Sequence, residues 1–246
     1  MGEDLGAHER LRDSNFVVKV LPSLRDAVGI EAEAFDRFSS LGCRLADHAV
    51  GTAEELEAIL PQAREYARRG WILQLHLGAQ RQTSSRLRRL SGPAGGYASI
   101  GNSFDIPALC RFLDGLERDD SLPRVILFPL NPADYIPLAT LTGSFAEDGV
   151  AGKIQLGPAW WFNDHELGIR AQLDALAAYG TLSTFIGMTT DSRSLLSMVR
   201  HDYFRRILCT WINERVEAHS FPDDAGLLES LVRDLCYHNA AGYLNL

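Results

Sequence analysis

The chain has 246 residues, of which 46% are hydrophobic and 23% are charged. This balance is typical of a globular protein and gives enough length for one large α/β domain. The formal net charge of −8 argues against binding to nucleic acid or to an anionic membrane. Because the sequence has no apolar segment of transmembrane length, no signal-peptide pattern and only scattered cysteines without metal-binding spacing, we expect a cytoplasmic protein.

Apolar runs recur along the chain and are separated by amphipathic stretches. Most of them start about 30 residues apart, which is the repeat of a β-α unit. They predict six strands, at residues 16–21, 43–46, 71–77, 125–130, 153–156 and 185–188. One gap is longer and contains a Gly/Ser/Pro-rich stretch at 91–102, which predicts an extended loop.

Helical periodicity fills the spaces between these runs. It predicts helices over residues 53–69, 106–116 and 165–179, and a helical tail with helices over 195–216 and 223–236. Alternation of strands and helices is typical of a parallel sheet wrapped by helices. The sequence therefore predicts an α/β protein.

Polar or aromatic residues follow five of the predicted strands at their carboxyl ends. In parallel α/β proteins, ligands and catalytic groups gather at this edge of the sheet. Each residue also has a structural alternative: a strand-end histidine is often a hydrogen-bonded core residue, and tryptophans often only pack. The coincidence at one edge favours a site on a (β/α)8 barrel. The residues are Asp47, His48, His76, Arg81, Asn131, Trp160, Trp161, Asp191 and Arg193.

Several segments resemble the uronate isomerase (glucuronate isomerase) family of the amidohydrolase superfamily. They are GCRLADHA (42–49), YARRGW (66–71), QLHLGA (74–79), WWFND (160–164), GMTTDSRS (187–194) and RHDYFRRILC (200–209). The resemblance extends from about residue 20 to the C-terminus. It implies a TIM barrel that interconverts D-glucuronate with D-fructuronate, and D-galacturonate with D-tagaturonate, through an enediol.

The resemblance also implies roles for three polar residues. Asp191 would be the metal ligand at the end of the eighth strand and would also move protons, and Arg193 would stabilise the enediolate. An internal salt bridge between these two is the structural alternative. His76 ends the fifth strand, where the superfamily places a metal-site histidine, and is a candidate catalytic residue. The implied cofactor is a divalent metal, zinc or manganese.

Substrate-binding residues are expected along the same edge. Arg81 is the candidate for the carboxylate of the hexuronate, since an arginine fork matches a carboxylate bidentately. Trp160 and Trp161 would form a wall of the sugar pocket, and His48 would make a polar contact. For all four residues, a purely structural role is the alternative.

One family feature is missing from this sequence. The first barrel strand of the family carries an HxH metal pair, but this chain has only Ala7-His8-Glu9 near its start. Counting back from the last strand as the eighth makes 16–21 the third. We therefore expect strands three to eight in a partial barrel over 16–246, with a helical tail at 195–246 and a poorly ordered segment at 1–15.

Such a partial barrel has consequences for assembly. We expect a C-terminal fragment, a truncated gene product, or a chain whose missing strands come from another polypeptide. An open sheet exposes apolar edges, so homo-oligomerisation or association with a missing N-terminal part is expected.

Three functional hypotheses follow. The first is a uronate isomerase that is complete only with the missing part. The second is a related metal-dependent hydrolase, in which the metal activates water. The third is a non-catalytic remnant that acts as a binding or structural subunit. The Trp-Trp-Phe-Asn and Thr-Asp-Ser-Arg segments favour the first hypothesis, and the absent HxH pair favours the third.

Overall fold

The computed structural model describes residues 23–25, 32–92, 96–189 and 195–245. Five parallel strands form its main sheet in the order β1-β2-β3-β6-β7, so neighbours in the sheet follow one another along the chain. A separate two-stranded antiparallel hairpin, β4 with β5, interrupts this succession. The strand bounds are β1 Ser23–Arg25, β2 Leu45–Val50, β3 Ile72–Leu77, β4 Ala79–Gln80, β5 Ser99–Ile100, β6 Arg124–Pro129 and β7 Ile154–Leu156.

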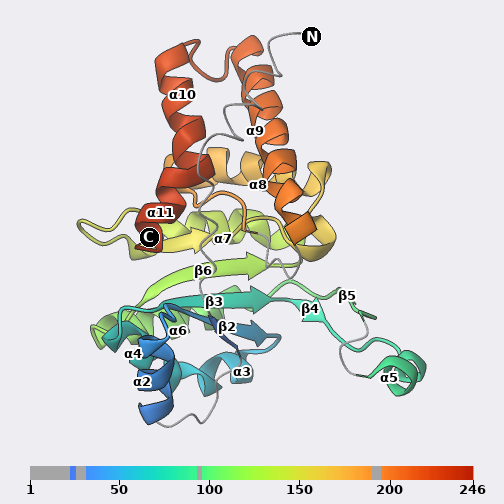
Figure 1. The fold of residues 1–246 in the computed structure, drawn as a ribbon, viewed down its shortest axis with the longest axis vertical. Helices are drawn as coiled ribbons and strands as arrows, with labels where there is room; N and C mark the ends of the chain where they lie inside the picture. Colours follow the sequence, from blue (N-terminus) through green and yellow to red (C-terminus); the bar gives the residue numbers. More distant parts are fainter. Residues whose placement is uncertain (1–22, 26–31, 93–95, 190–194, 246) are drawn as a thin grey trace.

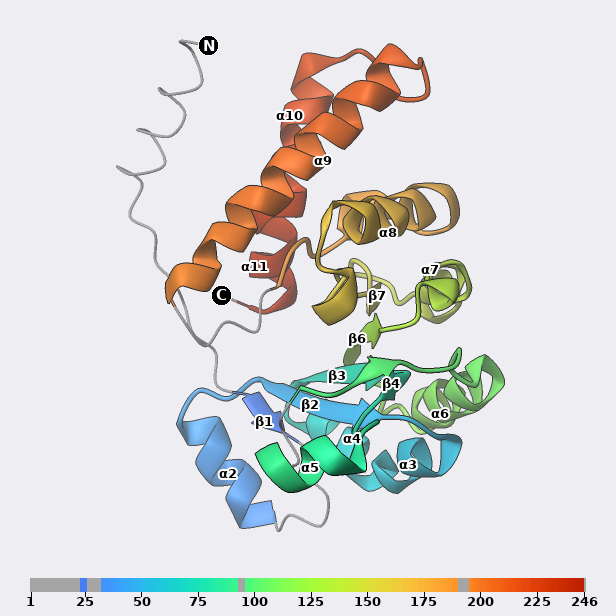
Figure 2. The same ribbon diagram turned by 90° about the vertical axis from the view of Figure 1, so that its right-hand side faces the viewer.

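Helices cover one face of this sheet. Figure 2 shows α3, α6, α7 and α8 along the same side of the strands. The helices of the sheet region are α2 Ala32–Ser40, α3 Ala53–Ala58, α4 Leu60–Arg68, α6 Ile106–Arg118, α7 Tyr135–Thr142 and α8 Glu166–Tyr179. The predicted α/β class with a parallel sheet is confirmed.

The two faces of the sheet differ in chemistry. Successive side chains of a strand point to opposite faces, and the register aligns residues of one face across the strands. One aligned row is Ala46, Leu73, Val125 and Ile154, all buried, and the helices pack on this face. The row on the other face is Asp47, Gln74, Ile126 and Gln155, followed nearer the carboxyl edge by His76 and Phe128. Polar side chains therefore gather on the face that the surrounding helices do not cover.

Two predicted strands differ from the structure. The strand expected at 43–46 begins two residues later and continues to Val50. Residues 185–188 are all buried, but they form no strand. Gly187 has a φ of 71°, and the side chain of Asn239 donates to the carbonyl oxygens of Ser183 and Phe185 at 2.8 and 2.9 Å. The tail thus occupies acceptors that a neighbouring strand would need. Residues 1–21, including the strand expected at 16–21, lie outside the described residues.

Two other segments have more structure than expected. The helix predicted over 53–69 divides at Ile59, because Pro61 lies in the first turn of α4, where its missing N–H costs nothing. The stretch predicted as a loop at 91–102 includes β5, and a short helix α5, Ser85–Ser91, precedes it.

The C-terminal tail is helical, as predicted. It consists of a 3₁₀ turn Leu195–Met198, α9 Val199–Glu217, α10 Ala225–Arg233, a π turn Asp234–His238 and α11 Asn239–Tyr243. Figure 1 shows α9 and α10 extending away from the sheet while α11 returns to it. The buried hydroxyl of Tyr243 lies 3.1 and 2.9 Å from the carbonyl oxygens of Val125 and Lys153, to which it donates. Among the described residues, no helix is long and apolar enough to cross a membrane.

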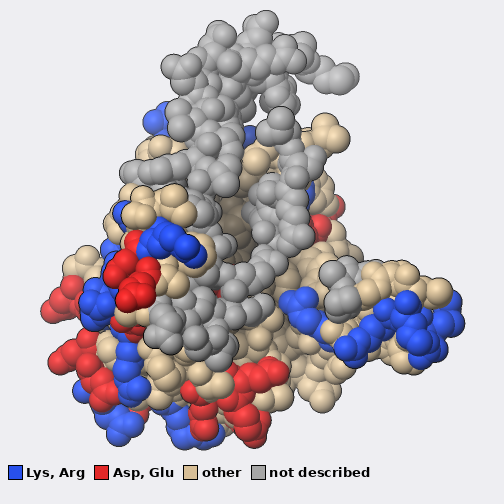
Figure 3. All heavy atoms as spheres, turned by 60° about the horizontal axis from the view of Figure 1, so that its bottom comes forward, with Lys and Arg blue, Asp and Glu red and all other residues tan. Residues whose placement is uncertain are grey.

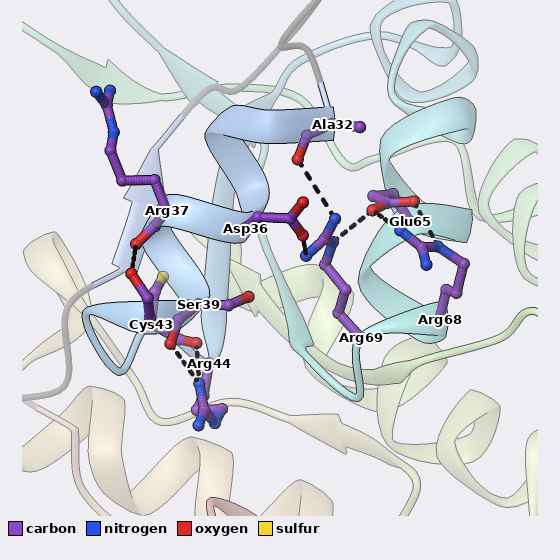
Figure 4. A network of polar contacts seen from close by, with 10 residues as sticks. Ala32, Asp36, Arg37, Ser39, Cys43, Arg44, Glu65, Arg68 and Arg69 are labelled. Atoms are coloured by element: carbon purple, nitrogen blue, oxygen red, sulfur yellow. Dashed lines mark hydrogen bonds and ion pairs between the residues drawn. The ribbon is translucent and has the colours of Figure 1, made fainter.

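A polar network joins the first helices to each other (Figure 4). The guanidinium of Arg69 bonds the carboxylate of Glu65, lies 2.5 Å from Asp36 Oδ1 and reaches the carbonyl oxygen of Ala32. Its carbon lies 5.6 Å from the ring centroid of Phe35. Because Arg69 is only 10% exposed, this one side chain connects α2 to α4 in a partly desolvated setting.

We expect Arg69→Met to lower the free energy of unfolding by about 1–2 kcal/mol, because the aliphatic stem can still pack but the bonds to α2 are lost. Urea unfolding measures this loss. Arg68→Met is the matched control, since exposed Arg68 bonds only Glu65 within α4 and its replacement should cost less than about 0.5 kcal/mol. Equal losses for the two variants would contradict the role given to Arg69.

Candidate active site

His76 and Asp47 form a close pair near the carboxyl edge of the sheet. They lie on neighbouring strands β3 and β2 and on the same face, and His76 Nδ1 is 2.5 Å from Asp47 Oδ1. The side chains are 17% and 10% exposed, so both are largely withdrawn from water but still reachable. A carboxylate that accepts from Nδ1 fixes the tautomer of the ring and leaves Nε2 as the nitrogen that can exchange a proton.

Aromatic rings enclose the imidazole of His76. The ring of Phe128, from β6, stacks on it with centroids 4.7 Å apart and planes 7° apart. Trp160 meets it edge to face at 4.4 Å, and its indole N–H donates to the carbonyl oxygens of Phe128 and Pro129, both at 3.2 Å. These contacts leave the imidazole little freedom to rotate.

The aromatic surface continues toward Arg81. Trp160 and Trp161 are 5.5 Å apart, and Trp161 stacks on Phe162 at 4.8 Å. The guanidinium of Arg81, just beyond β4, lies 5.4 Å from the centroid of the Trp161 ring. The structure therefore brings four of the predicted site residues, His76, Trp160, Trp161 and Arg81, into one continuous surface.

The loop that carries the tryptophans is held from three sides. Trp161 has a φ of 54°, an unfavourable conformation for a side chain of this size. The buried side chain of Asn163 donates to Leu130 O at 2.7 Å, at the end of β6, and Asp164 is ion-paired with Arg200 of α9. At Gly168 of α8 a Cβ would lie 2.2 Å from Asn163 O, so only glycine lets the helix approach this closely.

His48 is on the other face of β2, away from His76. It is buried, and its Nε2 lies 2.8 Å from the hydroxyl of Tyr66 on α4. The structure thus places it between the sheet and its helix layer, among the rows of apolar side chains. Of the described residues with a predicted catalytic or substrate-binding role, it is the one that does not join the surface around His76.

Asp191 and Arg193 lie outside the described residues. Within the described chain, no group of three or more His, Cys, Asp and Glu side chains could hold a metal ion. His76 with Asp47 has the form of a ligand and its orienting carboxylate, but two such groups do not make a metal site. The described residues alone therefore do not supply enough ligands to bind a metal ion.

A model of the glucuronate isomerase family matches residues 55–244. This chain belongs to the glucuronate isomerase family. The uronate isomerase of Salmonella arizonae is 42% identical over 85% of this chain, and that of Salmonella paratyphi B is 40% identical over 86%. The chain covers 51% and 52% of those relatives, so it spans about half of their length.

Solved structures show the same relation in three dimensions. The uronate isomerase of Thermotoga maritima matches with a TM-score of 0.74 and 25% identity, over 86% of this chain and 52% of that one. The glucuronate isomerase of Caulobacter crescentus matches with a TM-score of 0.74 and 24% identity, over 86% of this chain and 49% of that one, which shows a shared fold.

Three residues that shape this site had no predicted role of their own: Asp47, Phe128 and Asn163. Asp47 stood only among the polar residues at the strand ends. Its pairing with His76 could have been found from the alternation of β2, because it faces the same side as the neighbouring His76 once the register is known. The register itself depends on where β2 begins, and the prediction ended that strand before Asp47. Phe128 and Asn163 carried no sequence signal beyond an apolar run and a motif of aromatic residues.

We expect Asp47→Asn to release the tautomer of His76, because an amide can either donate to or accept from Nδ1 whereas a carboxylate can only accept. Nitrogen-15 NMR of the imidazole should show Nδ1–H alone in the wild type and a mixture of tautomers in the variant. Gln74→Ala, on the same face of the neighbouring strand, is the control and should leave the ring signals unchanged. Identical tautomer populations in wild type and Asp47→Asn would contradict the pairing.

His48 is expected to support the fold. We predict that His48→Ala lowers the free energy of unfolding by about 1–3 kcal/mol, since it removes a buried hydrogen-bond partner of Tyr66 and leaves a void. A double-mutant cycle with Tyr66→Phe measures the coupling by urea unfolding. Strictly additive losses would show that the contact between His48 and Tyr66 contributes nothing.

Proposed function

We propose that this chain takes part in the aldose-ketose isomerisation of hexuronates, converting D-glucuronate to D-fructuronate and D-galacturonate to D-tagaturonate. The observation that carries the proposal is the His76–Asp47 pair, enclosed by aromatic rings and followed by Arg81, in a chain of the glucuronate isomerase family. Because the chain spans about half the length of its relatives, the activity of the whole protein is part of this proposal.

The reaction needs a group that removes a proton and gives one back. The C2–H bond breaks, its electrons form the C1=C2 double bond of the enediol, and the carbonyl oxygen at C1 takes a proton. Loss of the O2 proton and protonation of C1 then give the ketose. His76 suits this role, since Asp47 holds its Nδ1 and stabilises the imidazolium that forms when Nε2 accepts the proton.

Substrate binding follows from the groups beside His76. Arg81 is the proposed partner of the hexuronate carboxylate, and its position above the Trp161 ring keeps the guanidinium at one end of the site. Trp160 and Trp161 would provide an apolar wall for the C–H faces of the sugar. The contact proposed for His48 finds no support in its position on the opposite face.

Asp191 and Arg193 complete the proposal as residues of the following segment. Arg193 would stabilise the negative charge of the enediolate, and Asp191 would be a metal ligand that also moves protons. A divalent zinc or manganese ion, when bound, would polarise oxygen atoms of the substrate. Since the described residues contain no three-ligand group, its remaining ligands would have to come from other residues.

We propose that the sheet is a section of a (β/α)8 barrel, with β1, β2, β3, β6 and β7 as the third to seventh strands and residues 185–188 near the place of the eighth. Parallel neighbours in chain order support this arrangement. The remaining strands would come from an N-terminal part of the protein or from another chain. We further propose a cytoplasmic, homo-oligomeric protein without a nucleic-acid or membrane partner.

The test is the conversion of glucuronate by the purified chain, with zinc or manganese added and without, followed by proton NMR in D₂O. The ketose should form with deuterium incorporated at C1. His76→Asn should lower kcat/KM by about 10²–10⁴-fold, and Arg81→Met should mainly raise KM. Arg118→Met, on the far side of α6, should match the wild type. No turnover under either condition would overturn the catalytic proposal for this chain and favour a binding subunit.

A further inference from the structure

A projecting arm, defined as residues 79–92 and 96–100, leaves the carboxyl edge of β3 (Figure 1). Its root is β4 paired with β5, and its outer part contains α5. The root is tightly fixed: the amide of Gly101 donates to Gly78 O at 2.9 Å, and Asn131 donates to Gly101 O at 3.0 Å. Asp134 then accepts from the amide of Phe104 at 3.1 Å. These bonds fix the root of the arm to the body of the protein.

No residue of α5 belongs to the hydrophobic core of the described chain. None of the residues of α5 is buried, and Leu90 is 71% exposed. A helix of seven residues is not stable by itself in water. Its Ser84 cap and the anchored root supply part of the missing stability. A surface on which α5 docks would supply the remaining stability of this helix.

The exposed side of α5 is cationic. Arg86, Arg89 and Leu90 have the i, i+3, i+4 spacing that places them on one side of the helix. No acidic residue occurs from 66 to 104, although the chain as a whole has a net charge of −8. Neither arginine forms an ion pair within the described residues. Figure 3 shows blue side chains gathered among tan ones on the projecting arm, apart from the red groups on the body.

The acceptor with matching chemistry is α3. The same i, i+3, i+4 spacing occurs in α3 at Glu54, Glu57 and Ala58, and all three residues are exposed. The two carboxylates form no ion pair in the part of the chain described. Thr52 caps this helix and fixes its orientation. Asp105 adds negative charge close to Glu54.

An apolar groove lies directly beside α3. It is a cavity of about 700 Å³ that Glu57 borders, and its apolar lining includes Leu60 and Phe112. Three arginines also line it, of which Arg64 and Arg118 are ion-paired with Asp119 and Asp114, while Arg111 has no such pair among the described residues. Glu57 thus places a carboxylate at the α3 side of the groove, and Glu54 lies one turn before it on the same helix.

We propose that α5 of one copy docks on α3 and this groove of a second copy. Leu90 would enter the groove over Leu60 and Phe112, while Arg86 and Arg89 would face Glu57 and Glu54. Reciprocal exchange of two arms gives a closed two-fold pair, the commonest symmetry of homo-oligomers. Arginine is also enriched at the centres of protein–protein interfaces. This proposal does not depend on the isomerase activity.

Sedimentation equilibrium of the purified chain at low and high salt tests the association. Wild-type protein should form pairs at about 50 mM salt and dissociate at about 500 mM, where charge attraction is screened. Arg86→Glu with Arg89→Glu should weaken the pair at least about tenfold. The matched control is Arg37→Glu with Arg88→Glu, which changes the net charge equally but alters α2 and the opposite side of α5. The control should associate like the wild type.

A mixing experiment identifies the surface. The variant R86E/R89E and the variant E54K/E57K should each be monomeric alone, because like charges meet in both. Mixed in equal amounts they should form pairs, since both contacts of the mixed pair are again attractive. Circular dichroism confirms that each variant is folded. A monomeric wild type, wild-type association of either variant alone, or a mixture that stays monomeric would each overturn the proposal.

Discussion

The parallel register between β2, β3 and β6 is the constraint on which the site depends. It aligns Asp47 with Gln74 and His76 with Phe128, so that an imidazole, a carboxylate and an aromatic ring from three strands share one face. A shift of β2 by one residue would exchange Asp47 with His48 and turn the carboxylate into the helix layer. The apolar row on the opposite face opposes such a shift, because it would have to leave the core.

The aromatic loop depends on this frame and on the helices beyond it. A left-handed residue such as Trp161 costs roughly 1–2 kcal/mol, and it persists only where its surroundings hold it. Here the hydrogen bond of Asn163 to β6, the ion pair of Asp164 with α9 and the contact at Gly168 hold it. The tail helix α9 therefore helps to position the aromatic loop of the site, through the ion pair of Arg200 with Asp164.

Much of the fold followed from the sequence, because buried parallel strands and amphipathic helices have periodic patterns. The strands near Trp71 and Val125 were located almost to the residue. Residues 185–188 are buried as predicted but form no strand, since an apolar run indicates burial but not pairing. There the carbonyl oxygen of Phe185 accepts from the side chain of Asn239, more than 50 residues later, rather than from a neighbouring strand. Likewise, His48 and His76 look alike in sequence, and only the register separates a core contact from a site residue.

The two ends of the strands differ in what they contribute: one end is fixed to the C-terminal tail, and the other carries the polar residues of the site. At the start of β6 and β7, the hydroxyl of Tyr243 secures the strands against the tail, and burial raises its pKa, which keeps it a donor at any physiological pH. At the other end, His76 and Asp47 remain partly accessible and polar. Partly desolvated polar groups reduce stability, so an edge of this kind requires the sheet to be fastened elsewhere. The buried residues of the tail do so, among them Trp211, Leu235 and Tyr243, although they are remote from His76 in sequence.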